Sequence, residues 1–188
     1  MEQVLFINAC VRTESRTRSL ADYVLSLLPG KVDTVDLNTE HIPLLDGDEL
    51  ERRNNHLNRG ELDAPMLRYA RQFAQADTIV IAAPYWDLMF PALLKIYLEA
   101  ITVSGITFKY NEGRPYSLCR AKRLVYITTA GGPIGEYDFG FQYVSTMAHG
   151  FFGIHDVKCV RAEGLDIIGA DVEGILARAH KEAETLLA

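Results

Sequence analysis

The hydrophobic pattern of this chain alternates between short apolar runs and longer segments with helical spacing. Five runs rich in apolar and β-branched residues have the length of β-strands, and they cover residues 3–9, 31–37, 77–84, 123–130 and 156–164. Segments with apolar residues at three- and four-residue intervals predict amphipathic helices over residues 20–28, 66–76, 93–101 and 172–183. Residues 139–152 form a less regular helical candidate. Strand and helix therefore alternate along the whole chain.

This alternation predicts how the elements pack. The central runs are almost entirely apolar, as in "TIVIAA" at residues 78–83, which is typical of strands buried on both faces of a parallel sheet. Right-handed crossovers through the helices then give a doubly wound α/β fold with a five-stranded parallel sheet. Ligands of such sheets bind beyond the carboxyl ends of the strands. We therefore expect functional residues in the loops after Ala9, Pro84 and Ala130.

Composition and charge narrow the class of protein. With 188 residues, 48% hydrophobic and 23% charged, the chain predicts a single domain over residues 1–188. Its net charge of −6 argues against nucleic acid or an anionic membrane as a partner recognised through bulk charge. The chain has no apolar run long enough to span a membrane, and its N-terminus reads as a first strand, not as a signal peptide.

Cysteine and histidine positions bear on location and metal binding. The three cysteines are odd in number and lack metal-ligand spacing, which suits a reducing compartment and predicts a cytoplasmic protein. Buried, unreactive thiols are the favoured interpretation. The five histidines are widely spaced, so no metal site is expected.

Residues 46–63 interrupt the alternation with a polar insertion rich in charged residues and asparagine. Two interpretations remain open. A solvated excursion is favoured over a lid that covers a substrate.

The first loop gathers hydroxyl groups and cations just before a helix that begins near Arg16. The N-terminus of a helix carries unpaired N–H groups and partial positive charge, which attract an anion. Ser15 and Thr17 add hydroxyl donors, and Arg12, with Arg16 or Arg18, adds charge, so the loop predicts a phosphate site. In the alternative interpretation, Ser15 only caps the helix and the arginines are solvated.

The motifs of several phosphate-binding families are missing from the first loop. Neither GxGxxG nor GxxxxGK[ST] is present, so a single phosphate group fits better than a dinucleotide or a nucleoside triphosphate. A receiver domain shares the sheet order but needs an acidic cluster after the first strand. This chain has Asn8, Cys10 and Arg12 there, which makes that alternative weak.

The second and third loops offer groups suited to a flat heteroaromatic ring. An aromatic pair followed by a polar side chain supplies stacking and hydrogen bonds, and paired glycines allow close approach of the backbone. The candidate ring-binding residues are Pro84, Tyr85, Trp86, Asp87, Leu88, Thr129, Gly131 and Gly132. Alternatively, the aromatic side chains belong to the core and the glycines form a bare turn.

Together these motifs resemble the flavodoxin-like NAD(P)H-dependent FMN reductases, in particular the azoreductase and quinone-reductase family. The resemblance covers almost the whole chain, and its most specific part is "IAAPYWDLMFPALLKIYLEAITVSGITFKY" at residues 81–110. It implies the sheet order 2-1-3-4-5, noncovalently bound FMN with its phosphate in the first loop, and a homodimer with shared active sites. Two positions depart from the family pattern: Asp87 replaces the usual Asn, and Ala130 replaces a frequent Arg.

The function that the resemblance implies is transfer of two electrons from NADH or NADPH through FMN to a quinone, azo compound or related aromatic acceptor. If donor and acceptor share one stacking space, they alternate, which predicts ping-pong kinetics. Tyr110 and Tyr116 are candidates for lining the substrate pocket, with ordinary surface aromatics on a hairpin as the alternative. An FMN-binding electron carrier or redox sensor without nicotinamide turnover is the second function class. A hydrolase ranks last because the chain has no G-x-S-x-G motif.

Overall fold

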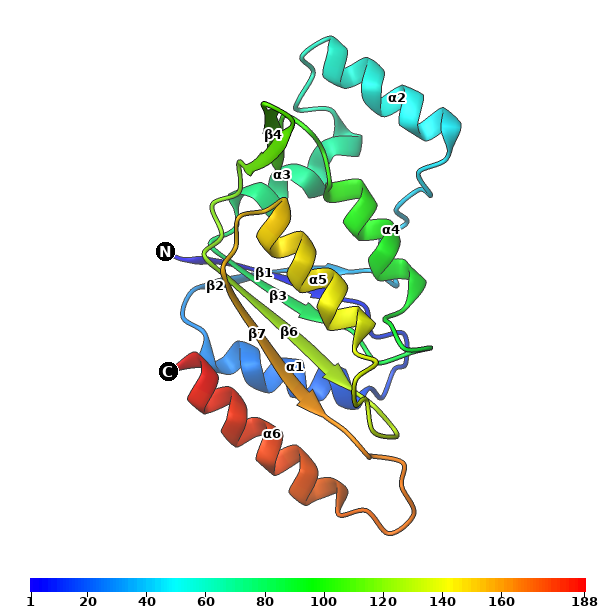
Figure 1. Cartoon of the computed structure of the whole chain (residues 1–188), viewed down its shortest axis with the longest axis vertical. Coiled ribbons are helices and arrows are strands. Elements are labelled where there is room, and N and C mark those ends of the chain that lie inside the picture. The colour runs from blue at the N-terminus through cyan, green and yellow to red at the C-terminus, as the bar shows by residue number, and fades with distance from the viewer.

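A five-stranded parallel sheet forms the centre of the computed structural model, which describes residues 1–188 (Figure 1). Its order is β2-β1-β3-β6-β7. The strands are β1 (Gln3–Asn8), β2 (Lys31–Asp36), β3 (Thr78–Ala82), β6 (Arg123–Thr129) and β7 (Asp156–Ala162). Counting only these five strands gives 2-1-3-4-5, so the predicted doubly wound sheet is confirmed.

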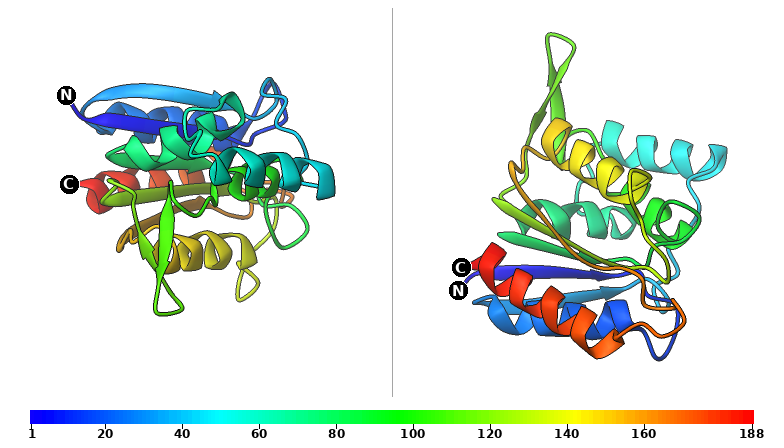
Figure 2. Two further views of the ribbon diagram at one scale, coloured as in Figure 1. Left: turned by 90° about the horizontal axis from the view of Figure 1, so that it is seen from above. Right: turned by 60° about the horizontal axis from the view of Figure 1, so that its bottom comes forward.

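Helices cover both faces of the sheet (Figures 1 and 2). One face carries α1 (Arg16–Leu27) and α6 (Val172–Leu187), and the other carries α3 (Arg68–Gln75), α4 (Ala92–Ile101) and α5 (Phe139–Gly150). Successive strand residues point to opposite faces, so Val4 and Phe6 pack under α1 and α6 while Leu5 and Ile7 pack under α3 and α4. None of the helices combines the length and the apolar composition that crossing a membrane requires.

The polar insertion forms a helix that the hydrophobic pattern did not predict. Helix α2 (Gly47–Asn58) starts at Asp46, whose carboxylate accepts a hydrogen bond from the Glu49 N–H at 2.9 Å. No residue of α2 is buried, so no apolar periodicity marked it. A single 3₁₀ turn, η1 (Pro65–Leu67), leads from the insertion into α3. The exposure of α2 supports the interpretation as a solvated excursion.

A β-hairpin projects from the connection between α4 and β6 (Figures 1 and 2). It pairs β4 (Phe108–Asn111) with β5 (Arg114–Ser117) in antiparallel fashion, and Glu112 and Gly113 turn the chain with φ of 50° and 78°. In Figure 1 the hairpin lies in the upper part, to the left of α2, whereas the carboxyl ends of β6 and β7 lie in the lower part.

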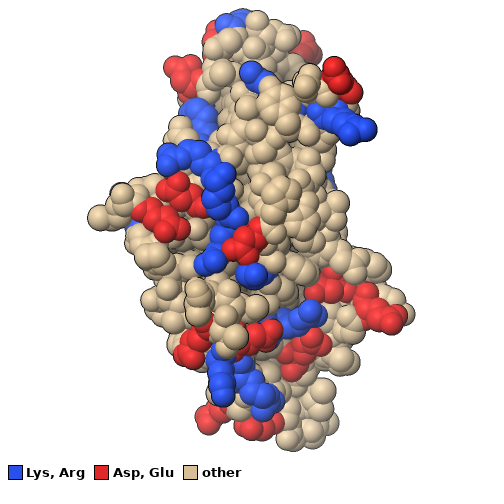
Figure 3. All heavy atoms as spheres, turned by 60° about the vertical axis from the view of Figure 1, so that its left-hand side comes forward, with Lys and Arg blue, Asp and Glu red and all other residues tan.

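The edge of the sheet where the strands begin carries charges of both signs. Figure 3, viewed from that side, shows Lys and Arg lying next to Asp and Glu. Arg120 pairs with Asp77 at 2.9 Å, and Arg123 pairs with Asp156 at 2.6 Å.

Candidate functional site

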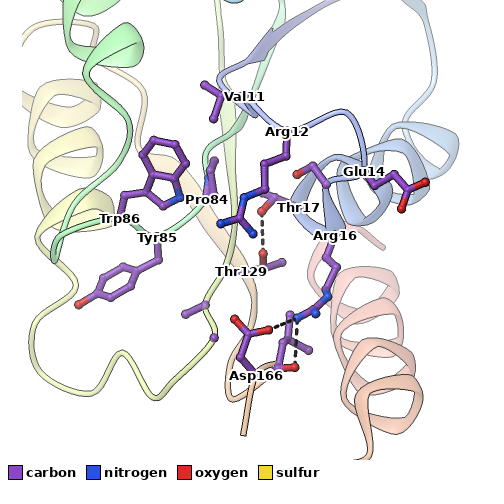
Figure 4. A pocket seen from close by; sticks show the side chains of 14 residues that line it. Val11, Arg12, Glu14, Arg16, Thr17, Pro84, Tyr85, Trp86, Thr129 and Asp166 are labelled. Atoms are coloured by element: carbon purple, nitrogen blue, oxygen red, sulfur yellow. Dashed lines mark hydrogen bonds and ion pairs between the residues drawn. The ribbon is translucent and has the colours of Figure 1, made fainter.

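A cavity of about 280 Å³ opens at the carboxyl edge of the sheet, between the loops that follow β1, β3, β6 and β7 (Figure 4). Most of the predicted site residues line it: Arg12, Ser15, Arg16, Thr17, Pro84, Tyr85, Trp86, Thr129 and Gly131. The structure therefore brings the three predicted loops to one place. Asp87, Leu88 and Gly132 belong to the same loops but do not line the cavity.

The first loop presents the N-terminus of α1 to this cavity. Ser15 is the N-cap, and its hydroxyl oxygen accepts a hydrogen bond from the Arg18 N–H at 3.2 Å. Capping uses a lone pair of Ser15 and leaves its O–H free to donate. The N–H groups of Arg16 and Thr17 donate no hydrogen bond within the chain. The cap and the predicted anion site are therefore compatible at Ser15.

The three arginines of the first loop have different surroundings. Arg12 forms no ion pair, and Figure 4 shows its guanidinium extending into the cavity. Arg16 donates to the Leu165 carbonyl at 3.1 Å and to Asp166 Oδ1 at 2.9 Å. Arg18 pairs with Asp22 at 2.8 Å and does not line the cavity. Arg12 is thus the cation of this loop that is free to meet an anion.

Two threonine hydroxyls tie α1 to the end of β6. Thr17 is 1% exposed, and its hydroxyl lies 2.6 Å from that of Thr129. The sequence predicted both residues as cofactor contacts. Each hydroxyl already has the other as a hydrogen-bond partner, so the pair fixes the helix N-terminus relative to the neighbouring strand.

The loop after β3 makes a tight turn. The backbones of Trp86 and Met89 exchange two hydrogen bonds of 3.0 and 2.7 Å across Asp87 and Leu88. Asp87 and Leu88 have φ of 50° and 67°, a conformation that costs a non-glycine residue about 1 kcal/mol or more. Their N–H groups donate no hydrogen bond within the chain. The loop therefore stores backbone strain and carries two free donors at its tip.

Gly131 packs against a side chain that the sequence did not reveal as its neighbour. A Cβ added at Gly131 would lie 2.3 Å from Asp166 Oδ2, so a side chain here would displace the Asp166 carboxylate. The paired glycines were predicted to allow close approach of a ring. At Gly132, by contrast, a Cβ would meet open space. The N–H groups of both glycines have no partner within the chain and remain free to donate.

The loop after β7 was missed as part of the site. Leu165 and Asp166 line the cavity beside Gly131. The signal was available, because residues 156–164 were predicted as a strand and the next residues must emerge at the same edge of the sheet. Asp166, the second residue after that predicted strand, has an acidic side chain.

Tyr110 and Tyr116 are not brought to this cavity. Both lie on the β4–β5 hairpin, with exposed fractions of 59% and 46%, and neither lines the cavity. Within one chain, no contact connects these tyrosines to the three loops. Their assignment to a substrate pocket stays a prediction.

A polar network at the ends of β1 and β2 supports the first loop. Asn8, 3% exposed, donates to Asp36 Oδ2 at 2.9 Å and accepts from the Cys10 N–H at 3.2 Å. Asn38 donates both to Asp36 Oδ1 at 3.0 Å and to the Cys10 carbonyl at 2.6 Å. Burial acts to raise the pKa of Asp36, but the hydrogen bonds from Asn8 and Asn38 outweigh it and hold this pKa below its usual value. The ionised carboxylate of Asp36 therefore anchors the start of the loop.

The cysteines are free thiols without a reactive environment. Burial raises the pKa of Cys10 to about 11 and the pKa values of Cys119 and Cys159 to about 12. The thiol form therefore predominates at neutral pH, and a thiol is a poor nucleophile.

Comparisons with known proteins agree with this geometry. The model of the family described as "Flavodoxin-like fold" matches residues 2–187. The chain is 39% identical over 196 aligned residues to FMN-dependent NADH:quinone oxidoreductase 2 of Clostridium acetobutylicum, covering 98% of this chain and 97% of that protein. It is 38% identical over 198 residues to the FMN-dependent NADH:quinone oxidoreductase of Coprothermobacter proteolyticus, covering 99% and 98%.

Solved structures give the same picture. The crystal structure of an azoreductase from Bacillus anthracis strain Sterne superposes with a TM-score of 0.85 at 27% identity, covering 100% of this chain and 99% of that one. An FMN-dependent NADH-azoreductase from Bacillus anthracis strain Ames Ancestor, in complex with FMN, gives a TM-score of 0.83 at 25% identity, covering 100% and 98%.

The Asp36 network leads to a pH-dependent stability prediction. Because the folded state lowers the pKa of Asp36, its contribution is complete above the unfolded-state value of 3.8 and is lost as the pH falls through the folded value. Asp36→Asn should therefore destabilise the chain at pH 7 by about 1 kcal/mol, after discounting for solvent, with the difference shrinking below about pH 4. Urea unfolding of both proteins from pH 3 to 7 measures this. Asp63→Asn, which changes an exposed carboxylate without a hydrogen bond or ion pair, is the control; a pH-independent loss in Asp36→Asn would contradict the prediction.

Proposed function

The chain belongs to the family of proteins with the flavodoxin-like fold, and on this basis we propose that it is an FMN-dependent oxidoreductase that transfers two electrons from NADH to quinones, azo compounds or related aromatic acceptors. The observation that carries the proposal is the cavity at the carboxyl edge of the sheet. It is lined by the N-terminus of α1 with the unpaired cation Arg12, and by Tyr85 and Trp86 next to the strained turn. Gly131, whose N–H group has no partner, lines it as well.

The residues at one end of the cavity fit a phosphate group. The unpaired N–H groups of Arg16 and Thr17, the O–H of Ser15 and the guanidinium of Arg12 are all donors, and the α1 dipole favours negative charge at this point. Such donors are suited to the oxygens of a phosphate monoester. FMN carries a phosphate of this kind, so we assign the phosphate to this end.

The other end fits a flat heteroaromatic ring. Trp86 is 38% exposed and offers an apolar face, and the N–H groups of Gly131 and Gly132 are free to bind polar atoms at a ring edge. The Tyr85 hydroxyl donates to the Tyr137 carbonyl at 3.1 Å, which ties the loop after β3 to the loop after β6. This hydrogen bond therefore connects the two loops that form the ring site.

The chemistry follows from the cofactor, and the chain supplies binding and orientation. FMN, when bound, supplies the redox chemistry between nicotinamide and acceptor. If donor and acceptor share one stacking space beside the ring, they bind in turn, which predicts ping-pong kinetics. The buried thiols take no part, because they are protonated at neutral pH.

We also propose that the active molecule is a homodimer. Apolar side chains stay exposed beside the cavity, with Leu88 46%, Tyr137 58% and Phe139 45% exposed. The rings of Tyr137 and Phe139 lie 6.2 Å apart, and exposed apolar side chains of this kind are typical of a surface covered by another molecule. In such a dimer, the apolar side chains beside the cavity would complete a shared active site, as the family resemblance implies. The unpaired thiols of the three cysteines support a cytoplasmic location.

The proposed oxidoreductase activity is tested by reducing and reoxidising bound FMN. The chain is loaded with FMN, freed of unbound flavin, and its visible spectrum is recorded without oxygen. NADH should bleach the flavin band and a quinone should restore it. A yellow protein that does not bleach would identify an electron carrier or sensor instead, and a colourless one would contradict FMN binding.

Arg12→Ala tests the phosphate site. Loss of one charge-assisted hydrogen bond of about 1.5–3 kcal/mol should weaken FMN binding by about 10- to 100-fold. Riboflavin lacks the phosphate, so its affinity should stay unchanged. Fluorescence titration of both flavins measures the effect; equal losses for the two flavins would remove Arg12 from the phosphate site.

The dimer is tested by size. Light scattering coupled to gel filtration at micromolar concentration should give twice the chain mass of 21.0 kDa, and Leu88→Glu should give the chain mass itself. A wild-type monomer under these conditions would exclude a shared active site.

A further inference from the structure

The loop after β7 is bound to the glycine loop along its backbone. The N–H groups of Gly164, Leu165 and Asp166 donate to the carbonyls of Gly132, Ala130 and Gly131 at 3.2, 3.1 and 2.9 Å. Three consecutive carbonyls of the glycine loop thus receive their partners from one segment, here called the strap (residues 164–166). Because these carbonyls are held, the orientation of the free N–H groups of Gly131 and Gly132 depends on the strap.

Arg16 connects the strap to α1. Its guanidinium donates both to the Leu165 carbonyl and to Asp166 Oδ1, at 3.1 and 2.9 Å. Figure 4 shows Arg16 extending toward Asp166, away from Arg12. Two acceptors 149 and 150 residues away in the chain therefore hold the first residue of α1 to the wall of the ring site.

Asp166 lies between Arg16 and the glycine loop. One carboxylate oxygen contacts Arg16, and the other lies so close to the Gly131 backbone that a Cβ at Gly131 would be 2.3 Å away. The carboxylate also lines the cavity. A phosphate placed against Arg16 would face this negative charge, whereas a phosphate beside Arg12 would not compete with an existing ion pair. The charge of Arg16 is thus already balanced by the chain itself.

We propose that Arg16 and Asp166 are positioning residues that act as a latch: they join α1 to the strap and so fix the Gly131–Gly132 segment against the flavin ring, while Arg12 alone supplies the side-chain cation for the phosphate. This inference rests on the proposed FMN binding. It assigns a role to Asp166 and changes that of Arg16, which the sequence predicted as a direct cofactor contact.

Comparing two flavins separates the latch from a phosphate contact. If Arg16 acts through the ring loop, Arg16→Met and Asp166→Ala should each weaken the binding of FMN and riboflavin by the same factor, about two- to fivefold for an exposed ion pair. The double variant should bind no more weakly than Arg16→Met, because Arg16→Met already removes the contact with Asp166 as well as the one with the Leu165 carbonyl. The absorption spectrum of the bound flavin should also shift in these variants, since the surroundings of the ring change.

Controls keep a general loss of folding apart from the proposed role. Arg120→Met breaks an ion pair of the same length, 2.9 Å, at the opposite edge of the sheet and should leave both affinities unchanged. Asp166→Asn keeps an acceptor oxygen for Arg16 and should recover part of the affinity that Asp166→Ala loses. This milder variant also provides the test if Arg16→Met does not fold.

Each outcome decides a different question. If Arg16→Met weakens FMN but not riboflavin, Arg16 is a phosphate ligand and the latch is wrong, although FMN binding stands. If all latch variants bind both flavins like the wild type, the latch is also wrong. If the wild-type chain binds neither flavin, the proposed function itself fails, which is distinguishable because no variant is needed to see it.

Discussion

The site depends on one constraint: backbone N–H groups that the fold leaves without partners at the carboxyl edge of a parallel sheet. A strand that ends there passes into a turn or a helix start, and neither pairs all of its donors. In this chain the unpaired groups belong to Arg16 and Thr17, to Asp87 and Leu88, and to Gly131 and Gly132. Of these residues, Arg16, Thr17 and Gly131 line the cavity, so donors from the first and third loops lie where a ligand rich in acceptors can bind them.

Charge then decides where the anionic part of the ligand lies. The cavity is lined by two cations, Arg12 and Arg16, and by two carboxylates, Glu14 and Asp166. Arg16 is paired with Asp166, so the local charge is balanced on that side. Arg12 has no carboxylate partner and lies next to the helix N-terminus, where the partial charge of α1 has the same sign. Figure 4 shows the Glu14 carboxylate pointing away from Arg12, so the end of the cavity beside Arg12 is positive and orients a ligand that carries its charge at one end.

The hydrophobic pattern predicted the fold well. Each central strand is buried on both faces, and a continuous run of apolar residues indicates such burial. It failed for α2, whose residues are all at least partly exposed and which starts at the Asp46 cap instead of an apolar stripe. At the site it identified three loops of the four. The contacts of Asp166 with Arg16 and Gly131 join residues far apart in sequence, and no local pattern encodes them. No local pattern encodes the Thr17–Thr129 pair either, in which the two hydroxyls bond to each other and connect α1 to β6.

These contacts between loops explain how the loops can hold a ligand in a defined position. Asn8 and Asp36 fix the start of the first loop to β2, and Thr17 fixes its end to β6. Tyr85 ties the strained turn to the loop after β6, and the strap holds that loop from its other side. Every wall of the cavity is thus bound to a neighbouring wall, and the ordering of each loop is completed on folding instead of on binding. Less of the binding free energy is then lost to conformational entropy, and the strain at Asp87 and Leu88 is maintained by the folded chain before any ligand arrives.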